Sequence, residues 1–136
     1  VATLPFPQQA RLAAALGYDG LEVAPFTLDP DAPHLLPVAH RAELRRIAAE
    51  EGAPITSLHW LLVAPAGLSI TTADAATRAR TLDVIRRLIG LAADLGATLL
   101  VHGSPKQRHV ATPGDAARAE EAMARAGDWA HAHAIT

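Results

Sequence analysis

The sequence predicts an α/β fold with a parallel sheet, because one pattern occurs three times at intervals of about 40 residues. The three segments are AALGYDGLEVAPF (14–26), AAEEGAPITSLHWLL (48–62) and AADLGATLLVHGSP (92–105). Each contains an alanine-rich helix end, a glycine suited to a left-handed cap, a short apolar strand and a polar residue near the strand's end. The intervals leave room for crossover helices, which join parallel strands.

Four helices are expected between and around these strands. The first runs from about Pro7 to Leu16, and the second from about Pro37 to Glu51. The third is the longest and begins with Thr72 as its N-cap and Asp74 in its first turn. Its apolar stripe comprises Leu82, Ile85, Ile89, Ala92 and Leu95. The fourth helix follows Pro113 and leads into Ile135.

Composition limits the class of protein. The chain has 136 residues, of which 50% are hydrophobic and 19% charged, as expected for a single α/β domain over 1–136. A net charge of -2 gives no electrostatic footprint for nucleic acid or anionic lipid. The absence of cysteine excludes disulfides and thiolate metal sites, and no apolar run reaches the roughly 18 residues of a membrane span. We therefore expect a cytoplasmic protein, truncated at both ends.

Polar residues stand near the ends of the three expected strands. Glu22, His59 and His102 hold this position. The carboxyl ends of parallel strands form the ligand-binding edge of α/β folds, so the three side chains could converge on one small molecule or metal ion. Each histidine could instead be a hydrogen-bonded packing residue, and Glu22 could belong to a structural ion pair. A strand covered on both faces would leave Glu22 little access to solvent.

The motifs GYDGLEV, SLHWLL and LLVHGSP, with the connector GLSITTADAATRARTLDVIRRLIGLAADLGA, resemble the xylose isomerase-like TIM barrels. This superfamily contains sugar isomerases, sugar phosphate isomerases and epimerases, and nucleases of the endonuclease IV type. The resemblance implies the N-terminal half of a (β/α)₈ barrel, a partial TIM barrel of about strands two to four. These strands would be Leu21 to Ala24, Ile55 to Leu61 and Thr98 to His102. The first strand would be missing or reduced to Val1 to Leu4, and the fifth would begin at Ile135.

The resemblance implies an isomerase or epimerase that moves a proton beside the carbonyl group of a small sugar or sugar phosphate in carbohydrate metabolism. Its divalent metal, Mn²⁺, Mg²⁺ or Co²⁺, would be bound mainly by strands five to eight, which this chain lacks. No catalytic residue is therefore expected within the fragment, and the isolated fragment is expected to be inactive. The substrate-binding candidates are Glu22, His59, Trp60, His102 and Lys106. Trp60 could equally be a core residue, and Lys106 an exposed loop residue.

Two alternatives remain at this point. In a zinc-dependent apurinic-site endonuclease, His59 and His102 would be metal ligands. The low basic charge disfavours nucleic acid as a partner, and the connector is closer to that of the isomerases. A non-catalytic fragment is the other alternative, and because half a barrel exposes a sheet edge, a homo-oligomer is conceivable. Of the remaining histidines, His34 and His40 beside the second helix are expected to be solvated.

Overall fold

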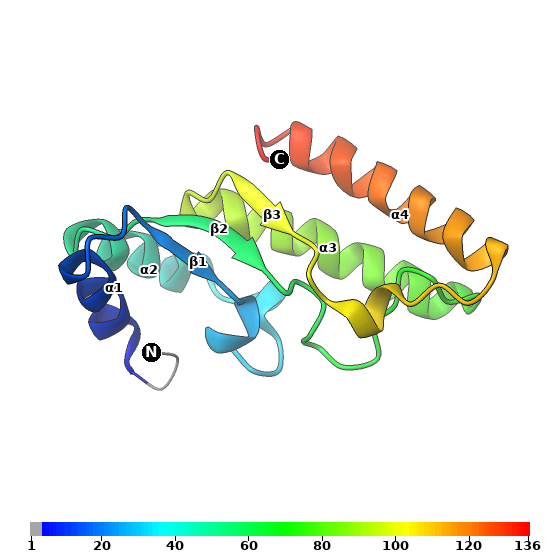
Figure 1. The fold of residues 1–136 in the computed structure, drawn as a ribbon, viewed down its shortest axis with the longest axis horizontal. Helices are drawn as coiled ribbons and strands as arrows, with labels where there is room; N and C mark the ends of the chain where they lie inside the picture. The colour runs from blue at the N-terminus through cyan, green and yellow to red at the C-terminus, as the bar shows by residue number, and fades with distance from the viewer. Residues whose placement is uncertain (1–3) are drawn as a thin grey trace.

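Helices and parallel strands alternate along the chain in the computed structural model, which describes residues 4–136 (Figure 1). The elements are α1 (Phe6–Ala15), β1 (Leu21–Val23), the 3₁₀ helices η1 (Pro25–Thr27) and η2 (Pro33–Leu35), α2 (Val38–Glu50), β2 (Ile55–His59), α3 (Ala75–Leu95), β3 (Leu99–Val101), the 3₁₀ helix η3 (Pro105–Arg108) and α4 (Pro113–His131). The predicted α/β class and the order of elements are confirmed. None of the helices described combines the length and the apolar composition needed to cross a bilayer.

The sheet has the order β1-β2-β3, and both strand pairs are parallel. Its register pairs Ser57 with Glu22 on one side and with Leu99 on the other. Backbone hydrogen bonds from Thr136 N to Thr98 O (2.9 Å) and from Leu100 N to Thr136 O (2.7 Å) align the last residue with β3. Thr136 therefore pairs with β3 at the place where the fifth strand of the barrel is expected to begin. The expected remnant of a first strand, 1–4, falls mainly outside the described residues.

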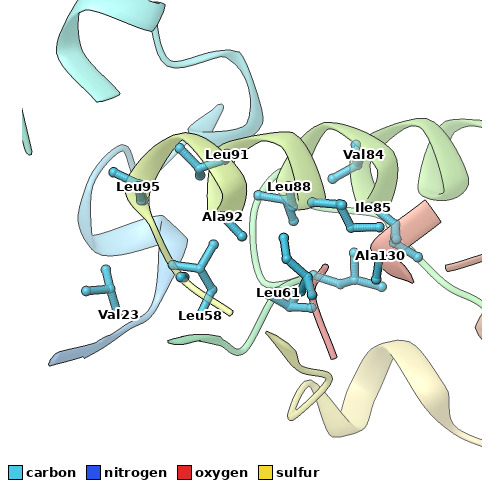
Figure 2. Close-up of a cluster of buried hydrophobic side chains, with 14 of the residues drawn as sticks. Val23, Leu58, Leu61, Val84, Ile85, Leu88, Leu91, Ala92, Leu95 and Ala130 are labelled. Atoms are coloured by element: carbon cyan, nitrogen blue, oxygen red, sulfur yellow. The ribbon is translucent and has the colours of Figure 1, made fainter. Parts of the chain in front are cut away.

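Helices of this chain cover one face of the sheet. Val23 and Leu58 pack beneath α3, against a row of buried side chains that includes Leu88 and Leu95 (Figure 2). The other face is open, and Leu99 and Val101 on it are exposed. The expectation of strands covered on both faces is therefore wrong for the described residues, because only one of the two faces has a layer of helices against it.

The ends of the helices follow the predicted glycine pattern. Gly17, Gly52 and Gly96 have φ angles of 82°, 83° and 83°. This left-handed conformation lets the chain leave each helix and turn toward the next strand. The N-cap prediction for α3 is wrong by two residues. Asp74, not Thr72, caps the helix, because its carboxylate accepts a hydrogen bond from Thr77 N at 2.7 Å.

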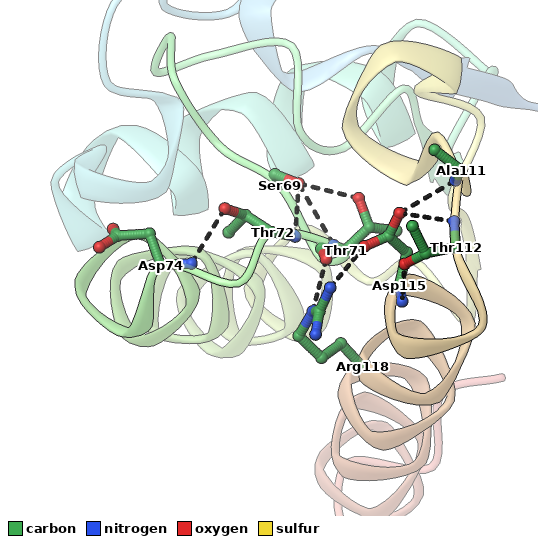
Figure 3. Close-up of polar contacts among 8 residues, drawn as sticks. All are labelled: Ser69, Thr71, Thr72, Asp74, Ala111, Thr112, Asp115 and Arg118. Carbon is green, nitrogen blue, oxygen red and sulfur yellow. Dashed lines mark hydrogen bonds and ion pairs between the residues drawn. The ribbon is translucent and has the colours of Figure 1, made fainter.

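The long loop that follows β2 is held against the start of α4 (Figure 3). Arg118 Nε donates a hydrogen bond to Thr71 O at 2.7 Å, and the same guanidinium pairs with Asp115. Asp115 accepts hydrogen bonds from Ala111 N and Thr112 N, each at 3.0 Å. Backbone groups with no partner in a helix or strand are thereby satisfied, which gives the loop a defined position at the carboxyl end of the sheet.

Candidate functional site

A carboxylate, a hydroxyl and an imidazole meet on the open face of the sheet. Ser57 Oγ donates a hydrogen bond to Glu22 Oε2 at 2.7 Å, and His59 Nδ1 lies 3.6 Å from Glu22 Oε1. The three residues meet because Glu22 pairs with Ser57 across the strands, and His59 lies two residues further along the same face of β2. Ser57 is buried, whereas the Glu22 side chain is 46% exposed. One carboxylate oxygen is therefore engaged, and the other faces the imidazole.

An exposed aromatic side chain lies beside this cluster. Trp60 is 48% exposed, and the centres of its rings lie 6.4 Å from Phe26 and 6.3 Å from His59. Its φ of 53° is unusual for a residue other than glycine and turns the chain sharply at the end of β2. Gly103 permits the placement, because a Cβ there would lie 2.9 Å from Trp60 Cδ1. The alternative of a buried core position for Trp60 is not met.

Hydrogen bonds join the two loops that leave β2 and β3. Leu62 N donates to the fully buried Ser104 Oγ at 3.1 Å, and Ile70 N donates to Gln107 O at 3.0 Å. The turn that carries Trp60 is therefore supported by the loop beyond β3. Rigid support of this kind is what positions binding side chains on a loop.

His102 does not join the other two strand-end residues. It lines a cavity of about 140 Å³ between α3, α4 and β3, whose other lining residues are mainly apolar. Its Nε2 atom is buried and has no hydrogen-bond partner within residues 4–136. Burial, and to a smaller extent Arg108, lowers the pKa of His102 below its ordinary 6.5. The expected convergence is found for Glu22 and His59 and not for His102.

Lys106 is exposed on η3, as expected for a loop lysine. Sequence reasoning missed three supporting residues, namely Ser57, Phe26 and Gly103. The alternation in ITSLH places Ser57 and His59 on one face of β2, so period-two reasoning could have found the serine. Phe26 and Gly103 carry no such signal, because their contacts with Trp60 join loops that are distant in the sequence.

The chain does not provide a complete metal site. Within residues 4–136, no group of three histidine, cysteine, aspartate or glutamate side chains is arranged to hold a metal ion. Glu22 and His59 could supply two ligands at most, whereas a catalytic zinc site usually takes three from the protein. His59 and His102, the two ligands of the zinc alternative, lie at different sites. The metal-ligating side chains of the described residues therefore do not suffice to hold a metal ion.

The cluster has the chemistry of a polyol-binding surface. An ionised carboxylate accepts hydrogen bonds from hydroxyl groups, and an imidazole can donate or accept one. An exposed indole offers a flat apolar surface to the C–H face of a ring or chain. The Glu22, His59 and Trp60 side chains are adjacent and accessible, so a small polyhydroxylated molecule could contact all three.

Residues 10–136 match the family model described as xylose isomerase-like TIM barrel. No curated relative matches the sequence. Among solved structures, a D-psicose 3-epimerase determined in the presence of D-fructose shares 21% identity and superposes with a TM-score of 0.76, over 99% of this chain and 46% of that chain. The 3-keto-D-glucoside 4-epimerase of E. coli shares 17% identity, with a TM-score of 0.70 over 100% of this chain and 51% of that chain.

A xylose isomerase-like TIM barrel protein from Mycobacterium smegmatis, in complex with magnesium, shares 23% identity. It superposes with a TM-score of 0.62 over 100% of this chain and 47% of that chain. The chain thus spans about half the length of the solved structures it resembles. These likenesses show that its fold is that of a partial TIM barrel.

Proposed function

Since the chain belongs to the xylose isomerase-like TIM barrel family, we propose that it forms the N-terminal half of a sugar epimerase or isomerase. The observation that carries the proposal is the contact of Glu22 with Ser57 and His59 on the open sheet face, next to the exposed Trp60. Two of the similar structures are named as sugar epimerases, which agrees with this choice. The substrate class is a small ketose or aldose, or its phosphate ester.

The residues of this chain bind and orient the sugar. Glu22 accepts hydrogen bonds from sugar hydroxyls through the oxygen that Ser57 leaves free, and Ser57 restricts the rotation of the carboxylate. His59 contributes a further hydrogen bond, and Trp60 covers an apolar face of the sugar. Fixing the substrate in this way reduces the entropy cost of the reaction. Lys106 contacts a phosphate or other acidic group of the substrate, and its exposed position on η3 leaves it accessible for that role.

The proton-transfer groups and the divalent ion belong, in this proposal, to the part of the protein outside this chain. A divalent ion would polarise the sugar carbonyl when bound. The described residues do not provide its full ligand set. The chain alone is accordingly expected to bind sugar weakly and to lack turnover.

The proposal is tested with Glu22→Gln in the full protein. Glutamine keeps the acceptor for the Ser57 hydroxyl but removes the charge that strengthens hydrogen bonds to the sugar. Loss of a charge-assisted bond of about 1.5–3 kcal/mol predicts a fall of roughly 10- to 150-fold in kcat/KM. Epimerisation or isomerisation of a panel of ketoses and aldoses, including D-fructose and D-psicose, provides the measurement.

The matched control is Glu43→Gln, which removes a carboxylate exposed on α2. This variant is expected to retain wild-type kcat/KM. Thermal unfolding of both variants separates a loss of sugar contact from a loss of fold. Full kcat/KM in Glu22→Gln would exclude Glu22 as a substrate contact, and no turnover of any sugar by the wild-type protein would exclude the isomerase proposal itself.

A further inference from the structure

A hollow lined by cationic side chains lies among the helices, apart from the open face of the sheet. Its volume is about 320 Å³, and its lining residues are His34, Arg41, Arg86, Arg87, Gly90 and His133. We call it the arginine hollow. It is assembled from η2, α2, α3 and the turn after α4, so its residues are far apart in the sequence. None of them belongs to the Glu22 cluster.

The three guanidinium groups are already oriented by the protein. Arg41 donates hydrogen bonds to Leu36 O at 2.7 Å and to Asp94 at 2.9 Å. Arg86 and Arg87 both pair with Asp83, at 3.0 and 2.7 Å. A guanidinium has more N–H donors than these bonds use, so each arginine keeps donors for a further acceptor. Three arginines share two carboxylates here, which leaves an excess of positive charge.

His34 contributes a polar atom that lacks a partner. Its Nδ1 is buried and makes no hydrogen bond, one of two such side-chain atoms among the described residues. The expectation that His34 is solvated is therefore wrong for this atom, because η2 packs it against α3. Burial, and then the nearby Arg87, lowers the pKa of His34 below its ordinary 6.5. A buried polar atom without a partner costs free energy.

Gly90 forms part of the wall of the hollow. It lies in the interior of α3, where glycine is less favourable than alanine. A Cβ at this position would meet no atom within 4 Å, so packing in the chain does not require the glycine. A longer side chain at this position would extend into the open space at the wall of the hollow.

We propose that the arginine hollow binds a small phosphate-type oxyanion, either inorganic phosphate or the phosphate group of a monoester. Arginine side chains match the geometry of phosphate oxygens and form paired hydrogen bonds with them. The hollow is large enough for such a group, and three arginines that keep free donors line it together with His34. This site is independent of the proposed sugar site, because it lies among the helices and shares no residue with it.

The pH dependence of binding depends on His34 and the charges around it. Asp29 and Asp83 favour its protonated form, whereas Arg80 and Arg87 oppose it. The other charged or titratable groups that line the hollow are Arg41, Arg86 and His133. A bound anion raises the pKa of His34, since it stabilises the imidazolium. Protonation of His34 favours the bound anion, whereas the phosphate itself loses one negative charge on protonation over about the same pH range, which weakens its attraction to the three arginines.

The test is a titration of the full protein with inorganic phosphate, followed by NMR of the His34 imidazole at about pH 6 and about pH 7.5. We expect saturable shifts at both pH values and a dissociation constant at least about tenfold larger in Gly90→Gln, whose side chain occupies the hollow. Gly127→Gln is the matched control, because Gly127 is also inside a helix and a Cβ there meets no atom within 4 Å. It is expected to bind phosphate like the wild type.

Circular dichroism of both glycine variants shows whether each helix is retained, as expected from the better helix propensity of glutamine. Absence of saturable shifts in the wild type would overturn the proposal, and so would equal phosphate affinity in Gly90→Gln and Gly127→Gln. Acetate at matched ionic strength is the carboxylate comparison. Acetate affinity equal to or above that of phosphate would overturn the assignment to a phosphate-type ligand.

Discussion

His59 and His102 occupy similar places in the sequence but very different places in the structure. Each histidine follows an apolar residue near the end of a predicted strand, in SLHWLL for His59 and in LLVHGSP for His102. His59 lies on the open face of the sheet, 3.6 Å from the Glu22 carboxylate. His102 lines an apolar cavity between α3 and α4, and its Nε2 has no partner among the residues that the structure describes. The same sequence pattern thus produces a partly exposed position beside a carboxylate once and a packing position with a buried nitrogen once.

The difference arises from a register offset of one residue. His59 pairs with Val101 across the two strands, so His102 lies one position further along than the equivalent of His59. Successive side chains of a strand point to opposite faces, and an offset of one residue therefore moves a side chain to the other face. Polar residues at strand ends indicate a common site only when their register also agrees.

The two faces of the sheet can be compared by shortening one leucine on each. Leu58→Ala removes a fully buried side chain beneath α3 and is expected to lower the free energy of unfolding of this chain by about 2–5 kcal/mol. Leu99→Ala shortens a side chain that is 42% exposed on the open face and is expected to cost less than about 1 kcal/mol. Urea unfolding of the two variants beside the wild type measures both values.

The Leu99 result also reports on association. If Leu99→Ala were as destabilising as Leu58→Ala, the open face would have to be covered in solution, for instance by a second copy of the chain. Sedimentation at several protein concentrations would then show a concentration-dependent mass. If the mass stayed that of a monomer while both variants lost the same free energy of unfolding, the conclusion that one face is covered and the other open would be contradicted.

Replacing His102 sharpens the contrast with His59. His102→Leu removes a buried nitrogen that lacks a partner and places an apolar side chain in an apolar cavity. We expect the free energy of unfolding to rise by about 1 kcal/mol. Sugar affinity of the full protein is expected to be unchanged, whereas His59→Leu lowers it. Weakened sugar binding in His102→Leu at unchanged stability would instead assign His102 a contact with the substrate.

The smallest expected effect is on the pH dependence of stability. Because burial lowers the pKa of His102 in the folded chain, the unfolded chain binds more protons as the pH falls below 6.5. The stability that the neutral, partly buried His102 contributes is fully present above pH 6.5. It is lost as the pH falls toward the lower pKa that His102 has in the folded chain. His34, whose pKa is also lowered, acts in the same direction.

Urea unfolding of wild type and His102→Leu between about pH 5 and about pH 8 measures this effect. The wild type is expected to lose stability over the acidic part of this range, and the variant is expected to lose less. A steeper acid dependence in the variant would mean that His102 is more easily protonated in the folded chain than in the unfolded chain.

Much of the fold could be predicted because its signals are local. The three glycines at 17, 52 and 96 end their helices as expected, since a left-handed cap depends on a single residue. The apolar stripe of the third helix predicted its buried face, which includes Ile85, Ile89 and Leu95. The N-cap of that helix was misplaced, because several residues of SITTAD can form a cap and the loop contacts select Asp74.

The candidate site was only partly predictable. Glu22, His59 and Trp60 were identified by their positions at the carboxyl ends of strands, and the structure places them together. The support from Gly103 depends on two loops that meet only in the folded chain. The arginine hollow is a similar case, since its residues come from η2, α2, α3 and the turn after α4.

The sequence by itself determined which segments become helices and strands, where the helices end, and which polar residues stand near the carboxyl ends of the strands. These properties follow from backbone preferences and from the spacing of apolar residues. Only the tertiary structure decided that His59 lies on the open face beside Glu22 and that His102 lies under the helices. The physical reason is that strand register depends on contacts between distant segments, and a shift of one residue exchanges the two faces.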